Sequence, residues 1–585
     1  VAAFALHARI ERHATIGGPK QYVTRAAYDH APSIGRSPVL DGDGAIVHRE
    51  QDITPALRGQ TACAPEVIHL GQASRTHHPI DRIQLDHIHR DVRGFRDLDA
   101  PGACPGGQHQ HLGLDGTVFG CGSDTLVVQP AGKNARGRIG RHDAESVVGG
   151  LDGGVQGPGE CTLDVHGKDY VIGRAFVTFL GCKKVVVGRD IRTHSNALFA
   201  ALSEGLTLQG ADVIDVGLCS TPMSYYANGL LEADASIMIT ASHNPAEWNG
   251  FKLCREQAIP ISGATGIADI ERIVNAVAFA PAAQTRGVVS ETDFSERYSA
   301  HVAKFFSLSR PVRIVADYAN AMGIVESCAL RDLIQIDPLY EELDGSFPNH
   351  EANPLKTETM DALSKKVASG SYDFGVAFDG DADRAGFVDE HGNIVPMDIV
   401  SAIIAQSILQ RTKGVVLYDL RSSWAVKEVI RESGGTPIMC RVGHAFIKRE
   451  MREHSAVFAG ELSGHYYFRD NYYTESSAMA VLSIASIISN GSLPLSEVVR
   501  PIRRYYASGE INSEVADSAR ILSVLRDKYS DGRLTELDGI SIEYDDWWFN
   551  VRSSNTEPLI RLNTEACTPE MMVRRRDELL AVIRS

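Results

Sequence analysis

The segment "KKVVVGRD", from Lys183 to Asp190, is a short β-branched run that ends at an aspartate. The same order returns in "VRIVADYANAMG" (312–323), where the run ends at Asp317, and in "GVVLYDLRSSWAV" (414–426), where it ends at Asp419. A helix-like segment follows each run. Buried strands that alternate with helices are typical of α/β domains, so the repetition predicts three of them in tandem.

The rest of the chain divides into a regular part and an atypical part. From about Thr162 onward the apolar spacing is regular, and after about Gly509 it becomes that of a smaller α+β domain with a terminal helix. The predicted domains are 161–301, 302–412, 413–508 and 509–585.

Residues 1–160 have an unusual composition. They contain no Met or Trp, only two Lys against fourteen Arg, and twelve of the 21 His. Glycine and proline interrupt nearly every window, so little apolar surface is available to offset the entropy of ordering. We expect a disordered segment or a mistranslated extension, from a frameshift or a wrong start; a poorly patterned accessory domain is the alternative.

Composition excludes several classes of protein. A net charge of −16 without a Lys/Arg run argues against a nucleic-acid partner. Ten cysteines without paired spacing are typical of reduced thiols, and no apolar stretch reaches the roughly 18 to 20 residues of a membrane span. We expect a cytoplasmic protein without a membrane partner.

The stretch "ITASHNPAEWNGFK" (239–252) follows the strand pattern "ASIMIT" (235–240). Its turn-forming residues would project Ser242 from the carboxyl end of that strand, where open α/β sheets bind ligands. A helix N-cap or a simple turn is the structural alternative. The surrounding Thr240, His243 and Asn244 favour a functional site.

The stretch "AFDGDADRAGF" (377–387) carries Asp379, Asp381 and Asp383 at alternate positions. Carboxylates this close repel one another unless a cation neutralises them, which favours a hard divalent metal, with magnesium preferred to calcium. Glu390 falls at the twelfth position of an EF-hand count, but Arg384 stands where that loop needs glycine. A surface acidic turn without metal is the remaining alternative.

Two polar stretches follow. In "GELSGHYYF" (460–468), Glu461, Ser463 and His465 share one side if the segment is extended, which suits sugar hydroxyls. In "RSSNTEP" (552–558), an arginine and hydroxyl groups crowd into a turn, which suits a phosphate. An ordinary polar strand edge and a plain polar hairpin are the respective alternatives.

In this order and spacing, the four stretches resemble the α-D-phosphohexomutase family, and within it the phosphomannomutase/phosphoglucomutase group. The resemblance covers about residues 162–585. It implies four domains around a central cleft, each giving one loop: a phosphoserine loop, a metal loop, a sugar-specificity loop and a phosphate-binding loop.

The resemblance also implies residue roles. Ser242 would be the phosphoserine and would bind Mg²⁺ together with Asp379, Asp381 and Asp383. The sugar contacts would be Glu461, Ser463 and His465, and the phosphate contacts Arg552, Ser554, Asn555 and Thr556. Other active-site groups would be His243, Lys252, Arg384, Arg421 and His444, with Lys252 and His465 as candidates for proton transfer.

The implied activity is interconversion of mannose 6-phosphate and mannose 1-phosphate through a hexose 1,6-bisphosphate, by a monomer or homodimer. The form Gly-Glu-Leu-Ser-Gly-His resembles the mannose/glucose branch, so glucose phosphates are alternative or additional substrates. A catalytically impaired sugar-phosphate binder and a magnesium phosphatase are the competing classes.

The resemblance fails near residue 160. The family opens with a Tyr-Asp-Ile-Arg-Gly type segment, and this chain has "LDGGVQGPGECTLDVHGKDY" (151–170) there instead. "RAAYDHA" (25–31) is similar but lies far upstream. We therefore expect the first domain to lack its first strand segment and one cationic group of the site.

Overall fold

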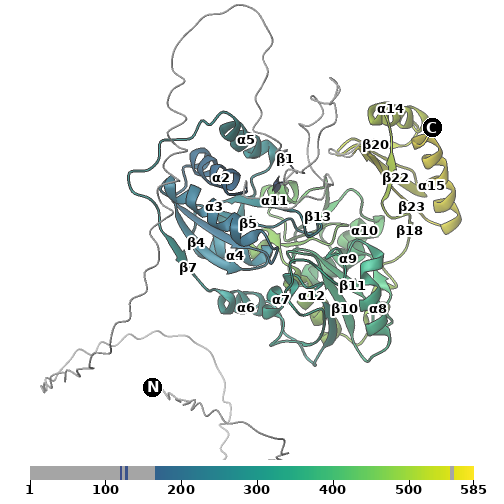
Figure 1. Cartoon of the computed structure of the whole chain (residues 1–585). Helices are drawn as coiled ribbons and strands as arrows, with labels where there is room; N and C mark the ends of the chain where they lie inside the picture. The colour runs from purple at the N-terminus through teal and green to yellow at the C-terminus, as the bar shows by residue number, and fades with distance from the viewer. Residues whose placement is uncertain (1–118, 122–124, 129–164, 554–558) are drawn as a thin grey trace, which may run out of the picture. The chain divides into compact units, whose positions relative to one another are not determined.

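The computed structural model describes residues 119–121, 125–128, 165–553 and 559–585 (Figure 1). These residues form four sheets of seven, five, five and six strands. The first three mix parallel and antiparallel strands and the fourth is antiparallel, so the prediction of three mixed α/β domains and a smaller α+β domain is confirmed. The domain boundaries stay predictions. In the described ranges no helix combines the length and apolar character needed to span a bilayer.

The first sheet has the strand order β1-β2-β6-β5-β3-β4-β7. Its strands are β1 (Phe119–Cys121), β2 (Thr125–Val128), β3 (Lys184–Arg189), β4 (Asp212–Leu218), β5 (Ala235–Ile239), β6 (Asn249–Arg255) and β7 (Val289–Glu291). Its helices are α2 (Val165–Leu180), α3 (Ser195–Leu208), α4 (Thr221–Leu230) and α5 (Ile267–Asn275). Strands β5, β3, β4 and β7 run parallel, and β6 runs antiparallel to β5.

Strand β3 is apolar throughout its middle because both faces of the sheet are covered. Val185 and Val187 belong to a core that includes residues of α2, α3 and α5, whereas Val186 belongs to the opposite core, which includes Met223 of α4. Successive side chains on a strand point to opposite faces, so a strand between two helical layers needs apolar residues at every position.

The first sheet begins with two short strands from the amino-terminal part of the chain. Strands β1 and β2 lie within the segment predicted to be disordered or non-native, and β2 pairs antiparallel with β6, with Thr125 opposite Lys252. These strands do not carry the family's opening segment, so the loss of that segment and its cationic group stays a prediction. An exposed edge such as that of β6 offers unpaired N–H and C=O groups, which a segment of weak local pattern can satisfy. The rest of 1–164 lies outside the described residues.

Helices α2 and α3 touch through their backbones. A Cβ placed on Gly205 would lie 2.1 Å from the Tyr170 carbonyl oxygen, and one on Gly173 would lie 2.5 Å from that of Leu202. Neither distance leaves room for a side chain, so these two glycines set the helix spacing on this face of the sheet.

The second sheet has the order β12-β11-β10-β8-β9 and the third β14-β13-β15-β16-β17. Along the chain, the elements around the second sheet are α6 (Ser295–Ala303), β8 (Arg313–Asp317), α7 (Gly323–Glu326), β9 (Gln335–Leu339), α8 (Asp361–Ala368), β10 (Phe374–Phe378), β11 (Ala385–Val388) and β12 (Ile394–Val395). The elements around the third sheet are α9 (Met397–Arg411), β13 (Val415–Asp419), α10 (Trp424–Glu432), β14 (Thr436–Cys440), α11 (His444–Glu453), β15 (Phe458–Gly460), β16 (Tyr466–Phe468), β17 (Thr474–Glu475), α12 (Ser477–Asn490) and α13 (Leu495–Val499).

The fourth sheet has the order β18-β23-β22-β21-β20, with β19 also paired to β23. Its elements are β18 (Tyr506–Ala507), β19 (Ile511–Glu514), α14 (Ser518–Lys528), β20 (Arg533–Thr535), β21 (Ile540–Glu543), β22 (Trp547–Ser553), β23 (Leu559–Ala566) and α15 (Pro569–Ile583). Helices α14 and α15 cover one face, and Leu525 and Leu579 share its core with Phe549 (Figure 1). The first three domains instead share one continuous apolar core.

The three aspartates that end the repeated β-branched runs have a common local role. Each carboxylate accepts a hydrogen bond from the backbone N–H two residues later: Arg192 N to Asp190 at 3.1 Å, Ala319 N to Asp317 at 3.0 Å and Arg421 N to Asp419 at 2.7 Å. This is the turn that aspartate favours, and it ends each strand at the carboxyl edge of its sheet.

Glu326, at the end of α7, joins the first three domains. Its buried carboxylate accepts hydrogen bonds from Ser220 Oγ at 2.5 Å, from Tyr298 OH at 2.7 Å and from the backbone N–H of Ala478 at 3.1 Å. Burial nevertheless raises the pKa of Glu326 from its usual 4.5 to about 7, although the Ser220 and Tyr298 hydrogen bonds oppose the shift.

We predict that Gly205→Ala loosens the packing of α2 on α3. The added methyl group has to displace the Tyr170 carbonyl, and overpacking of this kind costs about 1–3 kcal/mol of local stability. Because this loss makes local opening more frequent, hydrogen exchange of the backbone amides in β3 and β5 should become faster. Ala200→Ser, at an exposed position of α3, is the control and should leave these rates nearly unchanged.

We predict that Glu326 makes the stability of the first three domains depend on pH. The folded state holds its proton more tightly than the unfolded state, so the contribution is complete below pH 4.5 and is lost as pH rises through about 7. Between pH 4.5 and pH 8, the free energy of unfolding of wild type should fall relative to that of Glu326→Gln by up to about 3 kcal/mol. Thermal unfolding of both proteins at each pH measures this. A difference independent of pH, like that expected for the exposed Glu296→Gln, would contradict this.

Candidate active site

Ser242 lies just beyond β5 and faces the second domain. Its Oγ donates a hydrogen bond to Asp379 Oδ2 at 2.9 Å, and its backbone N–H donates to Thr240 Oγ1 at 2.9 Å. The residue has φ of 51°, a left-handed conformation that is uncommon for a residue with a side chain. The serine predicted to project from the strand end therefore meets the predicted metal loop.

Asp379, Asp381 and Asp383 connect β10 to β11, and all three are at most 1 % exposed. Their carboxylate oxygens lie within 4.8 Å of one another. Lys252, on β6 of the first sheet, enters this cluster, with Nζ 2.7 Å from Asp381 Oδ2 and 2.5 Å from Asp383 Oδ2. One lysine thus balances part of the charge of three buried carboxylates.

The charges of this cluster are unevenly compensated. Burial, together with Asp383 and Asp381, raises the pKa of Asp379 to about 8. Burial lowers the pKa of Lys252, but the aspartates outweigh it and hold the pKa above its usual value. Asp381 Oδ1 is buried and has no hydrogen-bond donor among the described residues. A hard divalent cation fits this oxygen-only donor set and would satisfy that atom.

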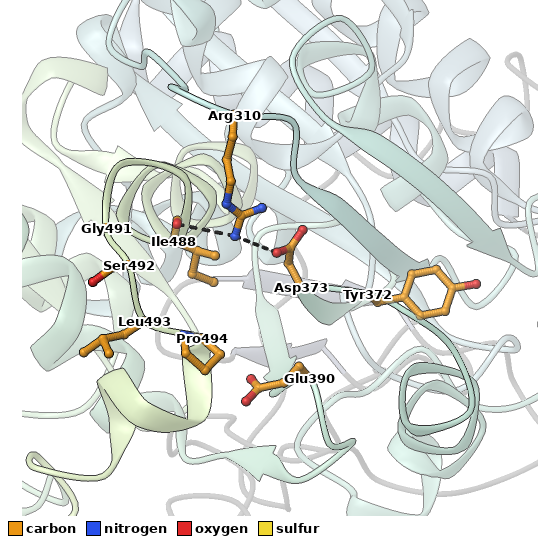
Figure 2. A pocket seen from close by; sticks show the side chains of 9 residues that line it. All are labelled: Arg310, Tyr372, Asp373, Glu390, Ile488, Gly491, Ser492, Leu493 and Pro494. Carbon is orange, nitrogen blue, oxygen red and sulfur yellow. Dashed lines mark hydrogen bonds and ion pairs between the residues drawn. The ribbon is translucent and has the colours of Figure 1, made fainter.

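The flanks of this loop exclude an EF-hand. They are the antiparallel strands β10 and β11, not helices. Glu390 does not reach back to the aspartates; it accepts a hydrogen bond from Ser496 N at 3.1 Å and lines a separate cavity with Arg310 and Pro494 (Figure 2).

Glu461, Ser463 and His465 do not form the predicted extended segment. They lie in a turn between the antiparallel strands β15 and β16, in which Gly464 has φ of 85° and donates its N–H to Glu461 O at 3.1 Å. The strands must reverse here, and only a residue that tolerates positive φ allows it. The three side chains still converge: Ser463 Oγ is 3.1 Å from Glu461 Oε2 and 2.9 Å from His465 Nδ1.

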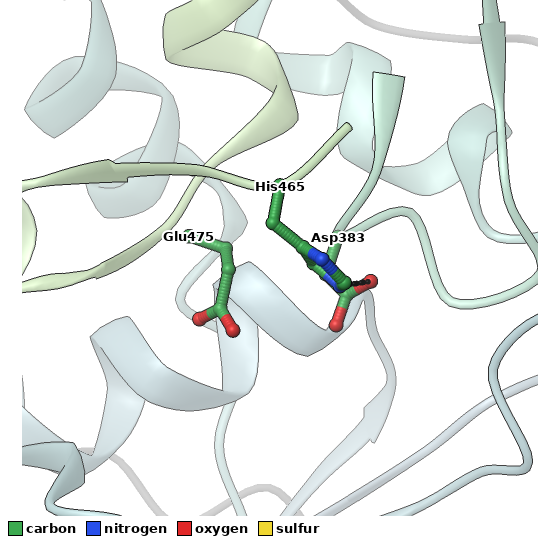
Figure 3. Close-up of side chains that lie close together, drawn as sticks. All are labelled: Asp383, His465 and Glu475. Atoms are coloured by element: carbon green, nitrogen blue, oxygen red, sulfur yellow. Dashed lines mark ion pairs between the residues drawn. The ribbon is translucent and has the colours of Figure 1, made fainter. Parts of the chain in front are cut away.

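His465 connects this turn to the acidic cluster. Its Nε2 lies 3.2 Å from Asp383 Oδ1, and Figure 3 shows the ring beside Asp383 with Glu475 nearby. Burial lowers the pKa of His465, but Asp383 outweighs it and raises the pKa above the usual value. Arg384 Nε donates a hydrogen bond to the same nitrogen at 3.3 Å, so the His465 ring lies between an arginine and an aspartate of the metal loop. Lys448 Nζ, 2.7 Å from Glu475 Oε2, neutralises Glu475.

Two further predicted histidines are half-buried, and their surroundings lower the pKa of each. His243 Nδ1 lies 3.5 Å from Ser242 Oγ, and burial, aided by Arg384, holds its pKa well below the usual value. The His444 ring is 6.4 Å from that of His465, and burial with the charge of Lys448 lowers its pKa in the same way.

The predicted arginines of the third and fourth domains meet at Glu510. Arg421 Nη1 and Arg552 Nη2 lie 3.5 Å and 3.2 Å from Glu510 Oε2. Burial raises the pKa of Glu510, but Arg421, Arg552 and Arg561 outweigh it and hold the pKa at about 2. Arg552 Nε is buried and has no hydrogen-bond partner in the described part of the chain. Ser554, Asn555 and Thr556 lie outside the described residues.

Arg192 is a residue of this site that the sequence analysis did not include. Its guanidinium is buried and donates to Ser242 O at 2.8 Å and Asn244 O at 2.7 Å in the serine loop. The signal was present in the sequence: Asp190-Ile191-Arg192 repeats the spacing of Asp419-Leu420-Arg421. Thr221 was also missed; its Oγ1 donates to Asp381 Oδ2 at 2.5 Å.

Comparison with protein families gives four matches along the chain. The alpha/beta/alpha domains I, II and III of the phosphoglucomutase/phosphomannomutase family match residues 169–281, 296–392 and 396–505, and the C-terminal domain of that family matches 510–582.

Individual proteins are similar over most of the same region. A phosphomannomutase of Escherichia coli K12 is 37% identical over 409 residues, which are 68% of this chain and 90% of that protein. A protein named phosphohexose mutases from Xanthomonas campestris is 40% identical over 402 residues, 67% of this chain and 90% of its own. The crystal structure of a phosphoglucomutase/phosphomannomutase family protein from Burkholderia thailandensis has a TM-score of 0.67 at 30% identity, covering 73% of this chain and 94% of its own.

We predict that Asp381→Asn weakens Mg²⁺ binding by at least about tenfold, because it removes a charge from the buried oxygen cluster. Calorimetric titration of Mg²⁺ into chelator-treated protein measures this. Glu390→Gln should bind Mg²⁺ as wild type does, because Glu390 contacts Ser496 instead. Equal affinity of all three proteins would exclude the aspartates as the metal site.

Proposed function

Because the chain belongs to the phosphoglucomutase/phosphomannomutase family, a family of phosphohexomutases, we propose that it interconverts mannose 6-phosphate and mannose 1-phosphate through a phosphorylated Ser242. The observation that carries this proposal is the position of Ser242 Oγ, 2.9 Å from Asp379 Oδ2 beside the acidic cluster. A phosphoryl group on this oxygen would lie where a divalent cation and Lys252 balance its charge.

The first step transfers the phosphoryl group of Ser242 to the free hydroxyl of a hexose monophosphate. The bond between phosphorus and Ser242 Oγ breaks, a bond to the sugar oxygen forms, and a hexose 1,6-bisphosphate results. The hydroxyl proton passes to a base of the site, and Ser242 Oγ leaves as an alkoxide or takes up a proton. The bisphosphate then turns around, and its other phosphoryl group returns to Ser242.

The charged groups support particular roles in this step. Lys252 is held protonated by Asp381 and Asp383, so it stabilises negative charge or donates a proton and does not act as the base. His243, neutral and 3.5 Å from Ser242 Oγ, is placed to exchange a proton with that oxygen. His465 is our candidate for proton exchange with the sugar hydroxyl.

A bound Mg²⁺ would be held by Asp379, Asp381, Asp383 and an oxygen of the Ser242 phosphate, and would neutralise charge on the transferred group. The remaining phosphate of the sugar would need cations away from Ser242, for which Arg421 and Arg552 are candidates. Glu461 and Ser463 offer an acceptor and a hydroxyl to the sugar ring. The described cysteines are free thiols, in accord with a cytoplasmic enzyme.

We predict turnover of mannose 1-phosphate with Mg²⁺ and a trace of hexose 1,6-bisphosphate, and its loss in Ser242→Ala. The substitution removes the only phosphoryl carrier that the proposal contains, so residual activity should be at background. Ser369→Ala, at an exposed helix end, is the control. Comparison with glucose 1-phosphate under the same conditions ranks the two sugars and tests dual specificity.

Other outcomes of this assay identify the competing classes. Release of inorganic phosphate without isomerised sugar would indicate a phosphatase. Binding of sugar phosphate by folded protein, without turnover or phosphate on Ser242, would indicate a catalytically impaired homologue.

A further inference from the structure

We propose that Arg192 is a positioning residue for the reaction, which holds the serine loop in the conformation that aims Ser242 Oγ at the acidic cluster. The proposal rests on the proposed role of Ser242 as phosphoryl carrier. It assigns no contact with the substrate to Arg192, because every N–H of its guanidinium is already used.

The guanidinium of Arg192 donates to one carboxylate and to four carbonyls of a single loop. The acceptors are Asp190 Oδ2 at 3.1 Å, Ser242 O at 2.8 Å, Asn244 O at 2.7 Å, Pro245 O at 2.6 Å and Trp248 O at 2.9 Å. Arginine has five N–H donors in a planar fork, and these contacts use all five. The loop that carries the serine is thereby wrapped around one buried side chain, which is 2 % exposed.

The conformation of Ser242 needs such support. A left-handed residue with a side chain costs on the order of 1–3 kcal/mol and persists only where its surroundings hold it. The Ser242 carbonyl is held on one side by Arg192 Nη2 and on the other by Gly380, where a Cβ would lie 2.2 Å from that oxygen. Its carbonyl and its N–H are thus both bonded, which fixes the backbone from which Oγ reaches Asp379.

The fork itself is held in place from two sides. Asp190 accepts from both the backbone N and Nε of Arg192, and the Phe347 ring of the second domain lies 5.1 Å from the guanidinium carbon. A lysine would keep the charge but has three donors on one atom, so it cannot reach carbonyls spread from Ser242 to Trp248.

Arg421 follows Asp419 at the same spacing at which Arg192 follows Asp190. Its guanidinium contacts differ from those of Arg192, so the aspartate turn by itself does not require an arginine to bind the serine loop. Its Nε and Nη2 bind Asp419 at 3.2 Å and 2.8 Å, and its Nη1 faces Glu510. The turn needs only the backbone N–H, as Ala319 shows in the second domain. The side chain of Arg192 is therefore not needed to end its strand, and its contacts with the serine loop are a separate role.

The test compares wild type with Arg192→Lys and Asp190→Asn. We expect kcat for Arg192→Lys to fall about 100-fold, the effect of displacing a reacting atom by about 1 Å. KM and the calorimetric affinity for mannose 1-phosphate should stay within about threefold, because Arg192 has no free donor for the sugar. Single-turnover transfer of phosphate from hexose 1,6-bisphosphate to Ser242 should slow in parallel. Asp190→Asn, which keeps an acceptor for Nε, should lose about tenfold in kcat and decides the question if Arg192→Lys does not fold.

Arg189→Lys is the matched control, because Arg189 lies three residues away and pairs with Asp215 outside the site. It should leave kcat unchanged. Unchanged kcat per folded molecule in both test variants, whatever their melting temperature, would overturn the proposal, as would a rise in KM at constant kcat. If wild type takes up no phosphate on Ser242, the proposed function fails and this inference falls with it; if wild type and Arg192→Lys take it up equally fast, only the inference fails.

Discussion

The mutual repulsion of three buried aspartates is the constraint on which the site depends. Asp379, Asp381 and Asp383 are almost fully removed from water, where the charged form of each raises the free energy of the others. Lys252 offsets part of this cost, and it comes from a strand of the first sheet whereas the aspartates come from the second. The same interaction that balances the charge therefore fixes the two domains against each other, and it brings Ser242 to the cluster.

The remaining site groups are placed by the ends of strands. Ser242 follows β5, the aspartates follow β10, Arg421 follows β13 and the Glu461 turn follows β15. Each of these strands has a parallel neighbour, and the carboxyl ends of parallel strands are where loops of an α/β sheet gather ligands. The aspartate turns at Asp190 and Asp419 end two such strands and direct an arginine into the site from each.

The domains differ in what holds them together. The first three share an apolar core, with Glu326 bonded to groups of all three, so their site residues sit on a common packed unit. The fourth has its own core, and its described contacts with the third domain include Trp424 N to Glu565 at 2.9 Å and Lys427 to Glu543 at 2.7 Å. Polar contacts of this kind exchange with water at little cost, whereas separating a shared core exposes apolar surface.

The sequence by itself determined the local features of this protein. The β-branched runs before Asp190, Asp317 and Asp419 set the strands and their turns, and the spacing of the aspartates in 379–383 set an acidic loop, because these properties depend on neighbours in the chain. It could not give the conformation of the Glu461 turn, which follows from the antiparallel pairing of β15 with β16.

Only the tertiary structure decided which of these features meet. Ser242 and Asp379 are 137 residues apart, Lys252 and Asp381 are 129 apart, and Arg192 finds its carbonyl acceptors at least 50 residues away. The edge strands β1 and β2 likewise depend on the open edge of β6. Contacts at such separations are set by how whole sheets and helices pack, and short-range patterns carry no information about that packing.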